Sequence, residues 1–113
     1  MARNFLEYDY NHNTVVDIFN DHVLKSGEKV FLKQRGKDGW KDLLWKETAS
    51  QVEAIASYII NSGIKSGGMI SIYSGNRPEW VVSDLAALSA GCADVAIYHE
   101  TPADLMPHCD FLA

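Results

Sequence analysis

The sequence contains only two cysteines, Cys92 and Cys109, which is too few for the disulfide framework of a small secreted protein. They do not form a Cys-x-x-Cys pair, and no His/Cys pair has the spacing of metal ligands on one helix face. Cys109 follows His108, but adjacent side chains on a regular element point in different directions. We therefore expect two reduced, buried thiols and no metal site.

Long apolar runs and clusters of positive charge are also missing. No run approaches the roughly 20 apolar residues of a membrane-spanning helix, and residues 1–10 lack the apolar core of a secretory signal. The 10 Lys and Arg residues are outnumbered by 15 Asp and Glu, and they are scattered along the sequence. This pattern argues against a nucleic-acid-binding surface and against a basic amphipathic face for membranes. The expectation is a cytoplasmic protein without a transmembrane segment.

What is present suits one folded unit. The 113 residues are 47% hydrophobic and 22% charged, with a net charge of −5. A chain of this size buries roughly two-thirds of its unfolded surface when it folds. The sequence has no internal repeat, low-complexity tract or long linker. Composition alone therefore predicts a single globular unit and excludes a disordered or fibrous chain.

Two helices and a hairpin are predicted in the first half. Thr14 is a candidate N-cap, and Gly27 ends the first helix. The apolar face of that helix comprises Val15, Ile18, Phe19, His22 and Val23. His22 is expected to be packed and hydrogen-bonded rather than functional. Two β-prone runs, 30–35 and 40–45, flank a Gly-Lys-Asp-Gly turn and predict a hairpin.

A second helix is predicted over residues 46–62 and ends at Gly63. Its apolar stripe comprises Val52, Ile55, Ala56, Ile59 and Ile60. The tail after residue 100 predicts a last short helix opened by Thr101 or Pro102.

A βαβ unit is predicted between the second helix and the tail. Residues 69–73 and 92–98 are strand-like, and a helix to about residue 90 separates them. Asn76 and Glu79 are a plausible capping pair for that helix, and Pro78 suits its first turn. The apolar side chains of this helix include Val81, Leu85 and Leu88. The sequence therefore predicts an α/β fold: a parallel strand pair, flanking helices and a β-hairpin. Because little chain follows the second strand, an open sheet edge is expected.

Two loops lie at the carboxyl ends of these strands, where open α/β sheets usually bind ligands. Residues 74–77 lead into a helix N-terminus but contain neither a Gly-x-Gly-x-x-Gly nor a Walker motif. A capped helix start with a packed Trp80 is therefore favoured over a phosphate site. The second loop, 98–101, places His99 beside Glu100, which suggests acid–base chemistry. However, the side chains of adjacent residues rarely point at the same substrate atom, and no candidate nucleophile lies beside His99 and Glu100. A catalytic role for this pair is therefore not favoured.

Four stretches, taken together and in order, resemble one family. They are residues 43–48 (LLWKET), 60–72 (INSGIKSGGMISI), 74–80 (SGNRPEW) and 88–98 (LSAGCADVAIY). The first and last resemble two core motifs of adenylate-forming enzymes. The third is very close to a stretch of long-chain acyl-CoA synthetases. The resemblance spans roughly residues 14–105 and identifies the chain with AMP-forming acid–CoA ligases.

The resemblance implies a fragment rather than a whole enzyme. The family uses ATP and magnesium to convert a fatty or related acid into an acyl-adenylate, which coenzyme A then attacks. The residues that perform these steps follow later in the family's chains, in a Pro-Lys-Gly phosphate loop and further motifs that this sequence lacks. Residues 1–113 are thus expected to be an incomplete N-terminal subdomain of the large domain, inactive alone. No catalytic, cofactor-binding or metal-binding residue is expected here.

The sequence also departs from the family pattern and leaves alternatives open. Ala96 stands where the family has Pro, and residues 99–101 differ from the usual continuation. Residues 105–110 break the amphipathic helix expected there, and the role of 104–113 is undefined. A stand-alone flavodoxin-like binding module is an alternative to the ligase fragment. A second alternative is a module that self-associates through its open edge as a homo-oligomer. Nothing in the sequence defines the acyl chain length.

Overall fold

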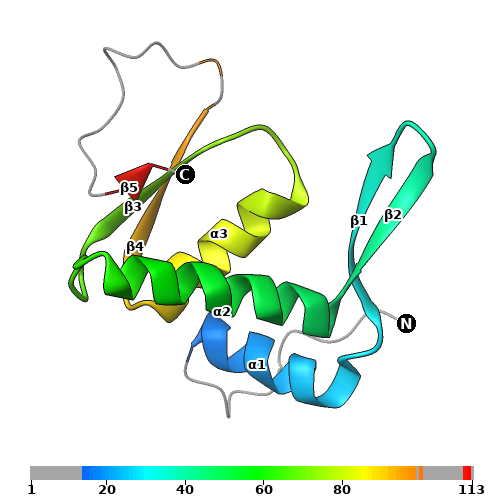
Figure 1. The fold of residues 1–113 in the computed structure, drawn as a ribbon, viewed down its shortest axis with the longest axis horizontal. Coiled ribbons are helices and arrows are strands. Elements are labelled where there is room, and N and C mark those ends of the chain that lie inside the picture. The colour runs from blue at the N-terminus through cyan, green and yellow to red at the C-terminus, as the bar shows by residue number, and fades with distance from the viewer. Residues whose placement is uncertain (1–13, 99, 101–110, 113) are drawn as a thin grey trace, which may run out of the picture.

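A computed structural model describes residues 14–98, 100 and 111–112, the last two as backbone only. The elements are α1 (Val15–Ser26), β1 (Val30–Gly36), β2 (Gly39–Leu44), α2 (Trp45–Asn61), β3 (Met69–Tyr73), α3 (Pro78–Ser89), β4 (Ala93–Ile97) and β5 (Phe111–Leu112). In Figure 1 the β1–β2 hairpin projects from a body built of three helices and a small sheet. The predicted short helix after Thr101, and Cys109, lie outside the described residues. No helix in the described part is long and apolar enough to cross a membrane.

Helix α1 begins as predicted and packs on the outside of the body. The Thr14 Oγ1 atom accepts a hydrogen bond from the Asp17 N–H at 3.1 Å and caps the helix. Only Phe19 is buried, and Val15 is 59% exposed, so the predicted apolar face is wrong at Val15. Residues 14–16 border a cleft against Leu88 and Ser89, so the first turn of α1 lies beside the end of α3 without being covered by it. His22 is exposed and stacks on Trp45, with ring centroids 5.2 Å apart. The ring contact agrees with the prediction, but the exposed side chain makes no hydrogen bond to a described residue.

An aromatic cluster ties α1, the hairpin and α2 together. The rings of Phe31 and Trp45 stack with centroids 4.0 Å apart. Phe19 lies against both, at 5.8 Å from Phe31 and 5.9 Å from Trp45. Tilted and stacked arrangements at these distances are the favoured geometries for aromatic pairs. This cluster fixes the base of the hairpin to the helices, and the tip is left projecting.

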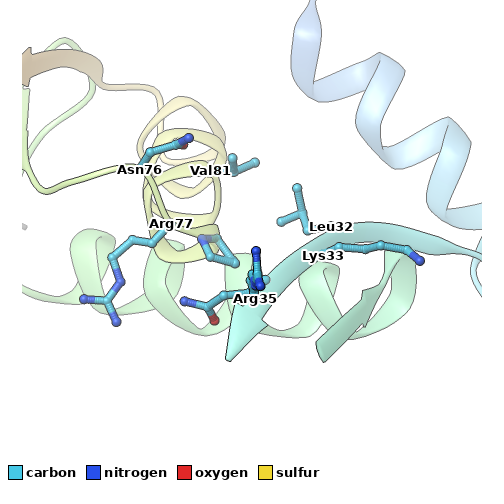
Figure 2. Close-up of a pocket in the computed structure, with 8 residues that line it drawn as sticks. Leu32, Lys33, Arg35, Asn76, Arg77 and Val81 are labelled. Carbon is cyan, nitrogen blue, oxygen red and sulfur yellow. The ribbon is translucent and has the colours of Figure 1, made fainter. Parts of the chain in front are cut away.

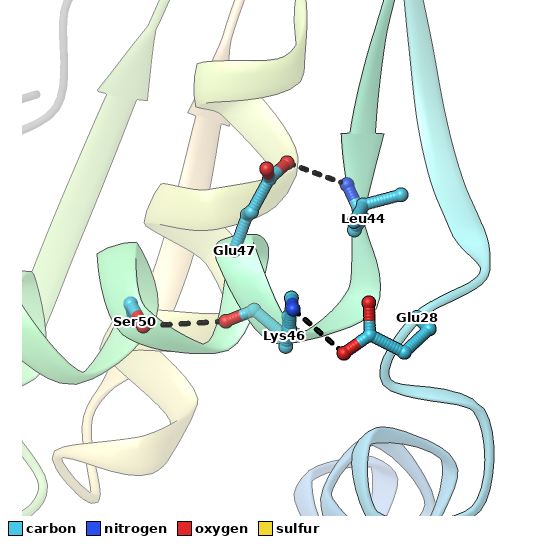
Figure 3. Close-up of polar contacts among 5 residues, drawn as sticks. All are labelled: Glu28, Leu44, Lys46, Glu47 and Ser50. Carbon is cyan, nitrogen blue, oxygen red and sulfur yellow. Dashed lines mark hydrogen bonds and ion pairs between the residues drawn. The ribbon is translucent and has the colours of Figure 1, made fainter.

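The junction between β2 and α2 is held by polar contacts (Figure 3). The Leu44 N–H donates a hydrogen bond to Glu47 Oε2 at 2.9 Å, and Lys46 Nζ contacts Glu28 Oε1 at 2.6 Å. The buried Thr48 hydroxyl donates to the Leu44 carbonyl at 2.9 Å. Helix α2 starts at Trp45, directly after β2 and one residue earlier than predicted. The carboxylate in its first turn satisfies a backbone donor at the junction.

The predicted parallel βαβ unit is confirmed. Strands β3 and β4 pair in parallel, in continuous register from Met69–Ala93 to Tyr73–Ile97, and α3 crosses between them. The sheet order is β4-β3-β5, with β5 also parallel to β3. The three residues 70–72 of β3 are each 1% exposed or less, so the central strand is covered on both faces. The sequence did not predict β5; among the described strands, β4 and β5 form the sheet edges.

The core lies where α2 and α3 pack against each other and the sheet. One cluster joins α1, α2 and α3 through Phe19, Val52, Ala56, Val82, Leu85 and Ala86. A second joins the helices to the sheet through Ile59, Ile70, Ala87 and Cys92. The buried Cys92 thiol is free, as predicted. Val82 is 2% exposed and was missed, because the predicted face of α3 was centred on Val81. Ile60 was predicted to be in the α2 stripe but is 56% exposed, since it lies at the edge of that stripe.

Gly91 makes a turn that most other residues would strain. It links α3 to β4 with φ at +78°, in the left-handed region that favours glycine. A Cβ atom there would lie 2.9 Å from Ser66 Oγ. Its carbonyl accepts the Gly67 N–H at 2.8 Å, so the two loops that precede β3 and β4 are joined. The stop predicted at this glycine is confirmed.

Removing the Ile59 side chain is expected to destabilise the fold strongly. Ile59 is 1% exposed, and Ile59→Ala leaves a cavity between α2 and the sheet. We expect a loss of about 2–5 kcal/mol in the free energy of unfolding, measured by urea denaturation. The matched control, Ile60→Ala on the same helix, should change it by less than about 0.5 kcal/mol. Similar losses for both variants would contradict this description of the core.

Substitution of Gly91 by alanine is expected to lower the free energy of unfolding more than the same substitution at another glycine with a positive φ. Gly63→Ala meets no atom within 4 Å and should lose about 1–2 kcal/mol from backbone strain alone. Gly91→Ala adds a clash with Ser66 and should lose more. The double variant Gly91→Ala, Ser66→Gly should return to the Gly63→Ala level, as measured by urea denaturation. Equal losses for both single variants would count against the clash.

Candidate functional site

The loop between β3 and α3 is the centre of the candidate site. Residues 74–77 leave the carboxyl end of β3, the middle strand, and lead into α3. Because the sheet order places β4 and β5 on opposite sides of β3, this is the kind of position where open α/β sheets bind ligands. Two clefts flank the loop. We call them the strand-end cleft and the hairpin cleft.

The strand-end cleft is the larger and is mostly apolar. Its volume is about 580 Å³, and it is lined by Ser74, Gly75, Asn76, Trp80, Ala96, Ile97 and Tyr98. Trp80 is half-buried and Tyr98 is 65% exposed, so two aromatic side chains border the cleft. Trp80 is therefore packed as the sequence suggested. No residue that lines this cleft carries a charge, and the cleft suits an apolar or planar group better than a phosphate.

The hairpin cleft separates β1 from the start of α3. Its volume is about 340 Å³, and it is lined by Leu32, Lys33, Gln34, Arg35, Asn76, Arg77, Pro78 and Val81. Three of these side chains are cationic, which would suit an anion if they converged. Figure 2 shows the Arg77 side chain directed away from β1 and the Lys33 side chain directed along the hairpin, away from α3. Lys33 and Arg77 therefore point away from each other across the cleft.

The start of α3 is built differently from the predicted capping pair. Arg77, not Asn76, is the N-cap, with φ at −155° and no side-chain cap hydrogen bond, while Pro78 opens the helix as predicted. Glu79 pairs with the Arg77 side chain, Nε to Oε2, at 3.0 Å. The Asn76–Glu79 prediction is wrong because the helix starts one residue later than a cap at Asn76 would require, and Glu79 pairs with Arg77 instead. Hydrogen bonds from its own backbone N–H and from Arg77 hold the pKa of Glu79 below its usual range.

The sequence also suggested acid–base chemistry in the loop at residues 98–101. Glu100 is exposed, and its predicted neighbours His99 and Thr101 lie outside the described residues. Among the described residues, no group of His, Cys, Asp and Glu could hold a metal ion. The feature that sequence reasoning missed is Asp94 on β4, whose Oδ2 atom is buried without a hydrogen-bond partner in the described part. An acidic residue within an apolar strand was the only signal that could have found it.

The pairing of Arg77 with Glu79 can be tested by titration. Arg77→Gln should raise the pKa of Glu79, measured by carbon-detected NMR. Because the folded-state pKa is lowered, the interaction stabilises the fold above the pKa of an unfolded Glu, about 4.3. That stabilisation disappears as pH falls through the folded value. Lys65→Gln removes a cation that is not among the contacts of this carboxyl group, and should leave the titration midpoint unchanged. An unchanged midpoint in Arg77→Gln would contradict the pairing.

Comparison with known proteins places this segment in a family. The sequence profile described as "AMP-binding enzyme" matches residues 19–109. A long-chain-fatty-acid–CoA ligase, FadD15, of Mycobacterium bovis is 33% identical over 94 residues, which is 82% of this chain and 16% of that protein. Fatty acyl-CoA synthetase A of Dictyostelium discoideum is 34% identical over 91 residues, 75% of this chain and 13% of that protein. The chain therefore spans only a small part of the curated relatives it matches.

Solved structures share the same arrangement of elements. The N-terminal subdomain of NpsA from Klebsiella oxytoca superposes with a TM-score of 0.71 at 24% identity, over 78% of this chain and 21% of that one. A fatty acyl-adenylate ligase of L. pneumophila gives a TM-score of 0.69 at 24% identity, over 74% of this chain and 15% of that one. At this identity the likeness shows the fold: an α/β piece with a hairpin and a parallel βαβ unit. With the profile match across most of its length, the chain belongs to the AMP-binding, adenylate-forming enzyme family, as part of its characteristic domain.

Proposed function

We propose that this chain is the N-terminal portion of a long-chain fatty acid–CoA ligase. In the proposed reaction, the carboxylate attacks the α-phosphate of ATP and releases pyrophosphate, which gives an acyl-adenylate. The thiol of coenzyme A then attacks the acyl carbon and releases AMP. The observation that carries the proposal is the identity of about one-third with proteins named as long-chain ligases, over most of this chain.

The described residues account for a supporting role and not for the chemistry. Formation of an acyl-adenylate needs positive charge or a metal ion placed around the phosphates in the transition state. The strand-end cleft is lined by uncharged residues, and Lys33 and Arg77 of the hairpin cleft point away from each other. The proposed role is therefore a scaffold: β3, β4 and α3 form a rigid wall of the large domain. ATP, magnesium and coenzyme A are proposed to bind residues of the complete ligase beyond this segment.

A chimeric enzyme tests the scaffold role. The region of the M. bovis ligase that matches this chain would be replaced by residues 15–97, and acyl-CoA formation measured with fatty acids of several lengths. We expect the chimera to form both acyl-adenylate and acyl-CoA, because the exchanged segment is proposed to act as a scaffold. The chain alone should show no ATP–pyrophosphate exchange. The matched control is the same chimera with Ile59→Ala, which should be less stable and lose activity at a lower temperature.

Two outcomes would contradict the proposal. A folded chimera that neither adenylates nor thioesterifies any fatty acid would show that the segment does not fit a ligase. The proposal would also fail if the reading frame of the gene stopped directly after Ala113, because the Ser/Thr/Gly-rich segment ending in Pro-Lys-Gly that the ligase reaction needs would then not be encoded. Adenylation without thioester formation in a chimera whose parent makes both would instead favour an acyl-adenylate ligase.

A further inference from the structure

A small apolar cleft lies where the start of α1 meets the end of α3. Its volume is about 290 Å³, and the described residues that line it are Thr14, Val15, Val16, Leu88 and Ser89. None of these side chains is charged. The cleft is separate from the candidate site, because the loop at residues 74–77 enters α3 at the opposite end of that helix. It is therefore a hollow surface that the ligase proposal does not involve.

The side chains in this cleft are more exposed than their helix patterns predict. Val15 belongs to the apolar face predicted for α1, yet it is 59% exposed. Val16 and Leu88 are only half-buried. Apolar surface that is removed from water stabilises a fold roughly in proportion to its area. A segment with apolar side chains that covered this cleft would therefore stabilise the contact between α1 and α3.

The chain itself supplies such a segment directly before α1. Residues 6–10 read Leu-Glu-Tyr-Asp-Tyr, so apolar and acidic side chains alternate. In an extended segment, successive side chains point to opposite sides, which would place Leu6, Tyr8 and Tyr10 on one face. Glu7 and Asp9 would then share the other face. These residues lie outside the described part of the chain, and the pattern comes from the sequence.

The segment is tethered within reach of the cleft. Tyr10 is four residues before Thr14, which lines the cleft, so the two Cα atoms can be at most about 14 Å apart. A tethered segment acts at an effective concentration in the millimolar range, whereas a second copy has to bind from solution. A stable interface between copies involves about 20–30 residues a side, far more than line this cleft. Both points favour the chain's own N-terminal segment as the occupant.

We propose that residues 6–10 fold back over the first turn of α1 and cover this cleft as an extended clasp. In this arrangement the apolar face of the segment contacts Val15, Val16 and Leu88, and its acidic face remains in water. Tyrosine suits such a position, because its ring is apolar and its hydroxyl can stay hydrated at the surface. The clasp joins the start of α1 to the end of α3. The inference concerns the folding of this chain and does not depend on the ligase proposal.

Alkylation of a cysteine introduced in the cleft tests the proposal. The full chain with Val15→Cys would be treated with iodoacetamide, and peptide mass spectrometry would separate this thiol from the two native cysteines. Cysteine behaves as a small apolar side chain, so the contact is largely kept. Adding Leu6→Ser, Tyr8→Ser and Tyr10→Ser together should raise the alkylation rate about ten-fold, which corresponds to a clasp that is closed about nine-tenths of the time.

Matched variants separate the clasp from a general effect on the chain. Leu24→Cys places a thiol in the last turn of α1, at a side chain that is 87% exposed and about 14 Å along the helix from position 15. Its alkylation rate should not respond to the serine substitutions. Glu7→Gln and Asp9→Asn change the other face of the segment and should leave the rate at position 15 unchanged. Tyr10→Ser alone should give a smaller increase than the triple substitution.

Any of three results would rule out the clasp. The first is an equal alkylation rate at position 15 with and without the serine substitutions. The second is an equal increase caused by Glu7→Gln and Asp9→Asn. The third is protection that grows with the concentration of the chain, which would assign the cleft to a second copy. Circular dichroism would confirm that each variant is folded, and Tyr10→Ser provides the comparison if the triple variant unfolds. No adenylation step enters this measurement, so its result is independent of the chimera.

Discussion

The packing of α2 and α3 on a buried parallel strand is the constraint on which this fold depends. Ala86 and Ala87 are fully buried on α3, and their small side chains let that helix approach both α2 and the sheet. Ile59 and Ile70 fill the space between the two layers, each 1% exposed. Parallel strands are stable only when both faces are covered, so the helix layer determines whether β3 and β4 pair at all. The position of the loop after β3 follows from this packing.

The parts of the fold that follow from local pattern were predicted well from the sequence. The bounds of β3, the cap at Thr14, the hairpin and the helix end at Gly91 each depend on residues close together in the chain. The parallel βαβ unit was also predictable from the order of its elements, because a strand, a helix and a second strand can be connected within one sheet in few ways. The family resemblance pointed to the same architecture.

The parts that depend on tertiary contacts were not predictable in the same way. Whether Ile59 or Ile60 is buried depends on the exact angle at which α2 meets the sheet, and the apolar stripe contains both. Glu79 pairs with Arg77 rather than with Asn76 because of side-chain geometry that spacing does not contain. Self-association through an open edge remains a prediction.

The unpartnered carboxylate oxygen of Asp94 has a consequence for how β4 meets other chains. Among the described strands β4 is an edge, and an edge strand offers backbone donors and acceptors to any strand that approaches. Because the Asp94 Oδ2 atom is already buried in the described part, it costs free energy in the folded state and is not offered to an approaching strand. A chain that pairs with β4 would therefore draw its hydrogen bonds from the backbone edge and not from this carboxylate oxygen.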